Sequence, residues 1–327
     1  MILCIINQCN RNCDYCFEGR FKQGPTRMMS LDDVRRICDF AQFSRAPMAP
    51  VNVMGGEPTL HPQLIDILSL LRQLNPTAEI CLLTNLLCAP ALLGEMEGLN
   101  LSCLTNVGGY PSYSAEERDL LHRNLAYLRE NRIFRSLGLA VTITRPDQDF
   151  GFLYEIMRRD EAPSTIGGVR IGISCPGFDF ANDFPADDSP GLGEKYLEIV
   201  TECHRIRPLI AFRNECPVNL CMMSEEIVAR LAPAVAHLTG CCQGNPDILP
   251  GFSTHWCFAF EGVPEMRIEN IFAYRNMAEV HAALYAMRRE LERRLDPQCD
   301  AERCTAIRCL GPCPALKYHK QYVRRNR

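Results

Sequence analysis

The stretch CNRNCDYC, residues 9–16, places Cys9, Cys13 and Cys16 on one short loop with the spacing C-x3-C-x2-C. The apolar run ILCIIN, residues 2–7, precedes this loop and has the composition of a buried strand. Three thiolates on one loop can hold three irons of a cubane [4Fe–4S] cluster and leave the fourth iron open to a small molecule. A zinc site is the alternative, but a structural zinc takes four protein ligands and the loop offers no fourth.

A second motif, VNVMGGEPTLHP, covers residues 51–62. It reads as a buried strand, Val51–Met54, that ends in Gly55, Gly56, Glu57 and Pro58. Glycines let a backbone approach a ligand closely, and a carboxylate accepts hydrogen bonds from an ammonium group. Alone, GGEP would be an ordinary turn. Its position after a strand, downstream of the cysteine loop, favours a ligand-binding segment.

The cysteine loop and the GGEP segment together resemble the radical S-adenosylmethionine (radical SAM) superfamily. The resemblance implies that the open iron binds the amino and carboxylate groups of SAM. It implies that a reduced cluster cleaves SAM to methionine and a 5′-deoxyadenosyl radical, which abstracts a hydrogen atom from substrate. Gly55–Pro58 would hold the SAM amino group, and Tyr15 would pack on the adenine. A flavodoxin- or ferredoxin-type electron donor is the implied partner.

Strand-like and helical patterns alternate up to about residue 210. This alternation predicts an α/β fold with parallel strands joined by helices, and the resemblance implies a partial, TIM-like (β/α)6 barrel. Ligands then gather at the carboxyl ends of the strands. Ser30 and Asp33 have the spacing of a capping box that opens the first helix. The predicted strands are Leu3–Asn7, Val51–Met54, Glu79–Thr84, Leu101–Val107, Leu137–Thr144 and Val169–Ser174.

Polar residues follow several of these predicted strands. Asn85, Asn106 and Ser174 suit the ribose and carboxylate of SAM, or the substrate; the alternative is that they cap strands or begin turns. Cys175 ends the sixth strand, where it could donate a hydrogen atom to a substrate radical, as a cysteine does in radical peptide epimerases. The alternative for Cys175 is a packed thiol.

The apolar run Leu209–Phe212 leads into a cysteine-rich region, so we expect a domain boundary near residues 205–215. Residues 1–210 would form the barrel, and residues 211–327 a small auxiliary-cluster domain. In that second domain we predict a helix from Ser224 to about Leu238, bent at Pro233, and a long helix carrying Val280–Leu295.

The cysteines of the last third resemble the SPASM or twitch extension, which binds one or two auxiliary [4Fe–4S] clusters. The final cysteines have the spacing Cys299-x4-Cys304-x4-Cys309-x3-Cys313, and no cysteine follows Cys313. The two x4 spacings and the missing last cysteine depart from the usual SPASM tail. Structural zinc is the alternative. Cys241 and Cys242 are adjacent, and the length of the spacer to Cys257 favours Cys242 as the cluster ligand. One grouping assigns Cys216, Cys221, Cys242 and Cys257 to one cluster, and Cys299, Cys304, Cys309 and Cys313 to another.

The remaining cysteines lie on strand or helix patterns and are expected to be small buried side chains: Cys4, Cys38, Cys81, Cys88, Cys103 and Cys203.

The chain has 327 residues, 19 of them cysteines, and a net charge of −4. This balance argues against nucleic acid or a membrane surface as a partner. Neither a membrane-length apolar run nor a signal segment is present, so we expect a cytoplasmic protein with reduced thiols.

The resemblance implies a peptide or small-molecule substrate. We expect modification of a ribosomally made peptide or protein side chain, by crosslinking, epimerisation or oxidation. The alternatives are a SAM-dependent dehydrogenase of a small-molecule alcohol and a non-catalytic iron–sulfur electron carrier.

Overall fold

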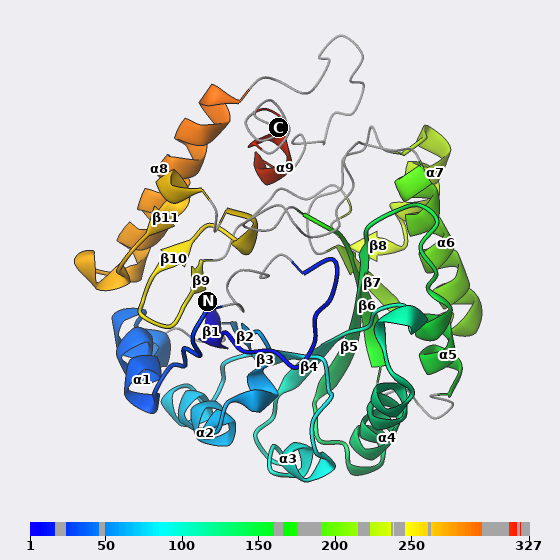
Figure 1. Cartoon of the computed structure of the whole chain (residues 1–327), viewed down its shortest axis with the longest axis horizontal. Coiled ribbons are helices and arrows are strands. Elements are labelled where there is room, and N and C mark those ends of the chain that lie inside the picture. The colour runs from blue at the N-terminus through cyan, green and yellow to red at the C-terminus, as the bar shows by residue number, and fades with distance from the viewer. Residues whose placement is uncertain are drawn as a thin grey trace.

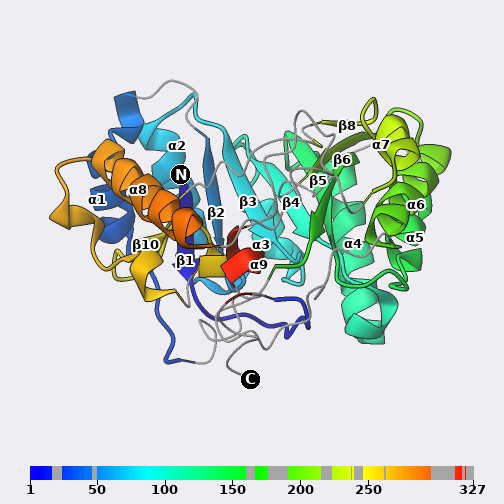
Figure 2. The same cartoon turned by 90° about the horizontal axis from the view of Figure 1, so that it is seen from above.

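The structure is a computed structural model that describes residues 1–16, 24–45, 50–159, 166–175, 191–214, 223–236, 238, 246–260, 263–295, 314–318 and 321. Eight parallel strands form an arc, and helices α1–α6 cover its outer side (Figure 1). The strands follow one another across the molecule in chain order (Figure 2). They are β1 (Ile2–Ile6), β2 (Val51–Gly55), β3 (Ile80–Thr84), β4 (Ser102–Asn106), β5 (Ser136–Ile143), β6 (Ile166–Ile173), β7 (Ala211–Asn214) and β8 (Val235–Ala236).

The helices of the outer layer connect successive strands and bury one apolar face each. In α1, Ser30 accepts from the Asp33 amide while the Asp33 side chain accepts from the Ser30 amide, so the predicted capping box is confirmed. The helices are α1 (Leu31–Phe40), α2 (Leu64–Leu74), α3 (Pro90–Gly94), α4 (Ala115–Asn131), α5 (Gly151–Arg159), α6 (Gly191–Ile206), α7 (Glu225–Leu231), α8 (Met277–Arg294) and α9 (Pro314–Tyr318).

The predicted α/β fold with a parallel sheet is confirmed, and each of the six predicted strands coincides with one of β1–β6. After residue 210 the chain continues the same sheet at both edges. Strands β7 and β8 extend it beyond β6. Strand β9 (Asp247–Ile248) pairs with β1, and β10 (Thr254–His255) and β11 (Arg267–Ile268) follow it. The domain boundary near residue 210 stays a prediction.

The predicted helix from Ser224 to about Leu238 is wrong in its second half. Helix α7 ends at Leu231, and Val235–Ala236 forms β8. Proline lacks an amide hydrogen and clashes with the preceding helical turn. Pro233 therefore ends the helix rather than bending it, and the chain after it is free to join β7.

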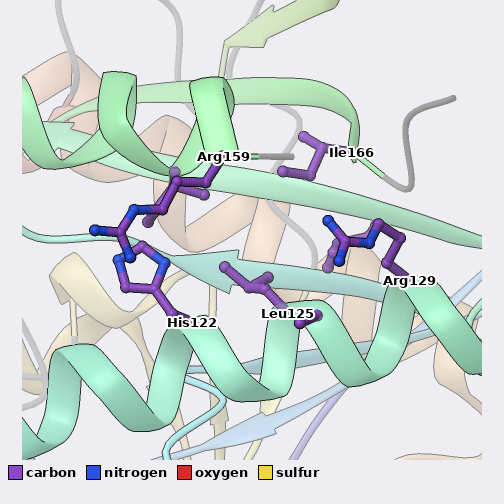
Figure 3. Close-up of a pocket in the computed structure, with 8 residues that line it drawn as sticks. His122, Leu125, Arg129, Arg159 and Ile166 are labelled. Carbon is purple, nitrogen blue, oxygen red and sulfur yellow. The ribbon is translucent and has the colours of Figure 1, made fainter. Parts of the chain in front are cut away.

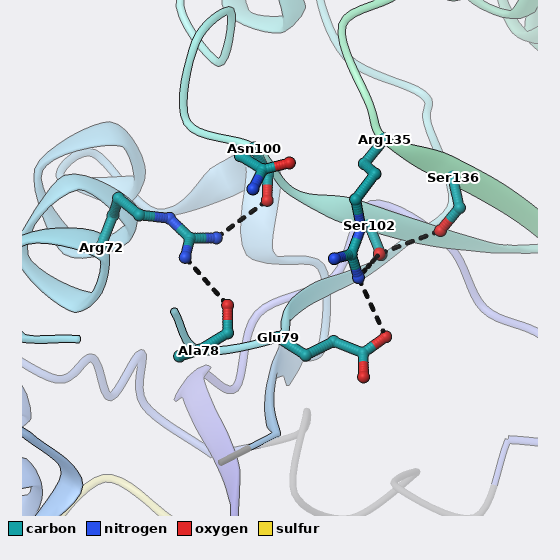
Figure 4. A network of polar contacts seen from close by, with 7 residues as sticks. All are labelled: Arg72, Ala78, Glu79, Asn100, Ser102, Arg135 and Ser136. Atoms are coloured by element: carbon teal, nitrogen blue, oxygen red, sulfur yellow. Dashed lines mark hydrogen bonds and ion pairs between the residues drawn. The ribbon is translucent and has the colours of Figure 1, made fainter. Parts of the chain in front are cut away.

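A polar network holds the amino ends of β3, β4 and β5 together (Figure 4). The Arg72 guanidinium, at the end of α2, donates to the carbonyls of Leu99, Asn100, Pro76 and Ala78 at 2.8–3.0 Å. These four carbonyls belong to the loops that enter β3 and β4. Beside them, Arg135 contacts Glu79 at 3.2 Å and Ser102 at 3.4 Å, and Ser136 contacts Ser102 at 2.9 Å.

Among the residues that the structure describes, no helix combines the length and the apolar character that crossing a bilayer requires.

Candidate functional site

The loop that carries Cys9, Cys13 and Cys16 leaves the carboxyl end of β1, as expected for a barrel site. All three cysteines are partly exposed. The Cys16 amide donates to the Cys13 carbonyl at 3.1 Å, which makes the C-x2-C segment a tight turn. The Arg11 amide donates to the Cys9 sulfur at 3.4 Å. Backbone N–H groups aimed at sulfur favour its thiolate form.

The two glycines of GGEP lie against the start of this loop. The Gly56 amide donates to the Ile6 carbonyl and the Glu57 amide to the Gln8 carbonyl, both at 2.8 Å. A Cβ at Gly55 would lie 2.1 Å from the Ile6 oxygen, and one at Gly56 would lie 2.3 Å from the Gln8 oxygen. Any side chain at either position would push the two backbones apart. The glycines therefore seat the end of β2 directly on the base of the cysteine loop.

The Glu57 carboxylate accepts four hydrogen bonds from neighbouring groups. Its Oε1 accepts from the Thr59 amide at 3.1 Å, the Thr59 hydroxyl at 2.7 Å and the Thr84 hydroxyl at 2.6 Å, and its Oε2 accepts from the Asn85 amide at 2.8 Å. A carboxylate has about four acceptor sites. Burial raises the pKa of Glu57, while these donors act against that rise. The carboxylate thus ties β2 to β3, and its contact with an ammonium group stays a prediction.

Asn10 and Arg11, which lie between the first two cysteines, anchor the loop to β3 and β4. The side-chain amide of Asn85 donates to Asn10 Oδ1 at 2.7 Å, and the side-chain amide of Asn10 donates to the Leu87 carbonyl at 3.0 Å. Arg11 is buried. Its guanidinium bonds to the carbonyl and hydroxyl of Ser112 and stacks 3.7 Å from the centre of the Tyr113 ring. The sequence analysis missed both anchors.

The other predicted residues take different places around this loop. Tyr15 is half-buried, and burial together with the nearby Cys13 thiol raises its pKa. Asn85 meets the loop through Asn10, as described. Asn106 is exposed at the end of β4, and its carbonyl accepts from the Tyr113 hydroxyl at 3.3 Å. Ser174 and Cys175 follow β6, two strands beyond β4, where Cys175 Sγ contacts the Ile173 carbonyl at 3.7 Å.

Of the predicted auxiliary ligands, Cys257 lies within the described residues. It is partly exposed and directly follows the β9–β10 hairpin. The others lie outside the described residues: Cys216, Cys221, Cys242, Cys299, Cys304, Cys309 and Cys313.

The cysteines expected to be packing residues are mostly buried. Burial raises the pKa of Cys38, Cys88 and Cys203 to about 12, which keeps them as neutral thiols. Cys4 and Cys103 are also buried, whereas Cys81 is partly exposed.

The donor set at β1 fits an iron–sulfur cluster. It offers three accessible thiols on a loop that several hydrogen bonds hold in place, and soft thiolates are the ligands that such clusters use. Within the described ranges, no group of three His, Cys, Asp or Glu side chains is arranged around a single metal ion.

A separate pocket of about 220 Å³ lies on the helical side of the sheet, between α4 and α5 (Figure 3). Glu155 lies 3.5 Å from His122 and 2.6 Å from Arg159 at its rim. Burial and the charge of Arg159 lower the pKa of His122. Leu137 of β5 also lines this pocket, so the pocket is on the outer side of the sheet, away from the cysteine loop.

Comparison with known proteins agrees with the geometry of the site. Residues 3–108 match the Radical SAM superfamily. A GTP 3′,8-cyclase of Edwardsiella ictaluri is 31% identical over 86 residues, which are 25% of this chain and 26% of that protein. A 7,8-dihydro-6-hydroxymethylpterin dimethyltransferase of Methanocaldococcus jannaschii is 30% identical over 70 residues, 21% of this chain and 14% of that protein. The matched segments thus span about a quarter or less of these relatives.

Solved structures share the fold over most of the chain. Streptococcus suis SuiB bound to precursor peptide SuiA has a TM-score of 0.64 at 15% identity, over 87% of this chain and 65% of SuiB. Native anSMEcpe with bound AdoMet and Cp18Cys peptide has a TM-score of 0.66 at 14% identity, over 95% of this chain and 88% of that one. Residues 3–108 therefore match a radical SAM domain, and the chain shares the fold of these solved structures.

Proposed function

We propose that this chain is a radical SAM enzyme that modifies a side chain of a ribosomally made peptide or protein, by crosslinking, epimerisation or oxidation. The observation that carries the proposal is the direct joining of the cysteine loop to Gly55–Glu57 at the carboxyl end of a parallel barrel. The fold that it shares with SuiB bound to SuiA, and with anSMEcpe bound to the Cp18Cys peptide, supports a peptide substrate.

The chain's own residues would hold and shield the reacting groups. When bound to Cys9, Cys13 and Cys16, a [4Fe–4S] cluster supplies the electron that cleaves SAM to methionine and a 5′-deoxyadenosyl radical. Asn10 and Arg11 keep the loop in place against β3 and β4. Gly55–Pro58, Tyr15, Asn85, Asn106 and Ser174 remain the proposed SAM contacts.

Two roles further along the chain are part of the same proposal. Cys175, partly exposed at the end of β6, is the proposed hydrogen-atom donor to a substrate radical. Cys257 and the cysteines outside the described residues are the proposed ligands of one or two auxiliary clusters. A flavodoxin or ferredoxin is the proposed electron donor.

A small-molecule substrate is the second candidate. The curated relatives carry the names GTP 3′,8-cyclase and 7,8-dihydro-6-hydroxymethylpterin dimethyltransferase, which refer to a nucleotide and a pterin.

Anaerobic reconstitution with iron, sulfide, SAM and dithionite tests the proposal. We expect 5′-deoxyadenosine by mass spectrometry, and a loss of about four irons per chain when Cys9, Cys13 and Cys16 are all replaced by alanine. A short peptide encoded beside the gene, deuterated at its side chains, should pass deuterium into 5′-deoxyadenosine. A fully loaded protein that forms no 5′-deoxyadenosine would indicate an electron carrier. Transfer from a sugar or nucleotide but not from the peptide would favour the second candidate.

A further inference from the structure

Two arginines lie next to each other on the open side of the barrel. Arg170 on β6 pairs in register with Arg213 on β7. They are the two charged residues within the eight parallel strands β1–β8, whose ranges contain no Asp or Glu. Backbones of neighbouring strands are about 4.8 Å apart, and paired positions point to the same face of a sheet. Two positive charges are therefore held side by side in the sheet.

Both side chains face the inside of the barrel. Leu137 on β5 lines the pocket between α4 and α5, so its side chain is on the helical side of the sheet. Side chains alternate along a strand, which places Ala140 on the inner face, and Ala140 pairs in register with Arg170. The ring of Phe212 contacts the ring of His204 on α6, at 4.8 Å between centres. Arg213, the next residue, therefore also points inward.

The inner positions next to these arginines carry small residues. Glycines 138, 168 and 172 and Ala140 occupy neighbouring inner positions on β5 and β6. Arg170 is half-buried and Arg213 is exposed. The charge of Arg170 also reaches across the interior to Cys81 on β3, where it acts against a larger effect of burial that raises the pKa of that thiol to about 11.

The arginine pair lies at the level of the site already described. The sheet register runs from Asn106 on β4 through Ala140 to Arg170 and Arg213. Asn106 stands at the carboxyl end of β4, beside the Tyr113 and Arg11 anchor of the cysteine loop. A group bound by the arginines would thus occupy the same interior as the reacting centre.

Two guanidinium groups at paired strand positions present their donors to the same face of the sheet. Guanidinium groups match the planar geometry of a carboxylate. We propose that Arg170 and Arg213 form a carboxylate-binding subsite that recognises an acidic side chain of the peptide substrate. This inference rests on the proposed function and adds to it a substrate class, a peptide with Asp or Glu near the modified residue.

SAM also has a carboxylate, but its expected contacts lie elsewhere. The cysteine loop, Gly55–Pro58 and Asn85 are at the ends of β1, β2 and β3. The arginine pair is on β6 and β7, at the far side of the arc (Figure 1). This separation favours the peptide substrate, rather than SAM, as the source of the carboxylate.

The test compares the reconstituted holoenzyme with its Arg170→Gln and Arg213→Gln variants. Arg205→Gln is the matched control, because Arg205 is exposed on α6, pairs with Glu202 and loses the same charge. The probes are a fluorescent glutamate-rich peptide, the same peptide with glutamine at each glutamate, and SAM itself. Peptide binding is followed by anisotropy with SAM present, and SAM binding by equilibrium dialysis.

We expect the wild type to bind the glutamate peptide about tenfold more tightly than the glutamine peptide. Each arginine variant should lose most of this preference, with SAM affinity and peptide-free 5′-deoxyadenosine formation within about twofold of wild type. Arg205→Gln should behave as wild type. Because Arg213 is exposed, Arg213→Glu offers a second check that does not depend on refolding of the interior: it should reverse the preference toward a lysine-rich version of the peptide.

Three results would overturn the inference. One is a wild type that does not distinguish the two peptides. Another is an unchanged preference in both arginine variants. The third is a loss of SAM affinity with the peptide preference intact, which would assign the pair to the SAM carboxylate. A wild type that forms no 5′-deoxyadenosine but still prefers the acidic peptide would instead count against the proposed function alone.

Discussion

At the scale of single residues, hydrogen-bond partners show which residues hold the cysteine loop in place at the carboxyl end of the barrel. The spacing of Cys9, Cys13 and Cys16 is a chemical signature, and it predicts that they are cluster ligands. No such signature marks Asn10 and Arg11, because their partners at Leu87, Asn85 and Ser112 are distant in sequence and leave no periodic pattern. The only available signal was two polar residues between closely spaced cysteines.

Replacing Arg11 with methionine should weaken the cysteine loop. The change removes the bonds to Ser112 and a stacking contact on Tyr113 that is worth about 0.5–2 kcal/mol. We expect the reconstituted protein to lose iron to a chelator several times faster than wild type. Arg145→Met is the control, because Arg145 is exposed and pairs with Asp147 at 3.1 Å. Equal iron release from the two variants would show that Arg11 does not hold the loop.

Replacing Glu57 with glutamine tests whether its carboxylate joins β2 to β3. The amide nitrogen of glutamine would face donors at Thr59, Thr84 or Asn85 and leave at least one buried group unsatisfied. We expect the free energy of unfolding of the apoprotein to fall by about 1–3 kcal/mol. Glu79→Gln, at an exposed pair with Arg135, should change it by less than about 0.5 kcal/mol. Urea titrations of both variants measure the difference. An unchanged free energy of unfolding for Glu57→Gln would show that the carboxylate does not join β2 to β3 and is available to a ligand.

At the scale of elements, the sequence predicts β1–β6 well because each is a compact apolar run followed by a helical pattern. It fails after Leu231 because Pro233 permits either a bent helix or a helix end, and the choice depends on whether β7 has a free edge for Val235–Ala236. Two-residue strands such as β9 and β10 are too short to show alternation, so their addition to β1 depends on tertiary pairing.

His61 joins the segment that precedes α2 to Met29, which precedes α1, and makes this contact depend on pH. Its Nδ1 accepts from the Gln63 amide at 3.1 Å, so Nε2 carries the hydrogen that is donated to the Met29 carbonyl at 2.9 Å. Burial lowers the pKa of His61 below 6.5, although the bond to Met29 acts against this. The neutral ring is thus favoured in the folded state. Its contribution is present above about pH 6.5 and is lost as the pH falls through the lowered pKa.

The corresponding experiment measures the unfolding free energy of apoprotein and of His61→Gln between about pH 7.5 and about pH 5. We expect the wild type to be more stable by about 1–2 kcal/mol at the higher pH and this advantage to shrink toward the lower one. An advantage that grows on acidification would mean that the folded state prefers the charged ring.

At the scale of the whole molecule, the two ends of the barrel have separate roles, as parallel barrels generally do. The carboxyl ends carry the cysteine loop, GGEP and the arginine pair, whereas the amino ends carry the Arg72 network (Figure 4).

Arg72→Met keeps the length of the side chain but removes charge-assisted bonds to four loop carbonyls, so the free energy of unfolding should fall by about 2–3 kcal/mol. Below the unfolding transition, this variant should bind iron, release it to a chelator and form 5′-deoxyadenosine at wild-type rates. Arg11→Met should show the opposite pattern, with faster iron release and a smaller change in apoprotein stability. If Arg72→Met also released iron faster, stability and cluster binding would be coupled through the strands, and the two ends would not be independent.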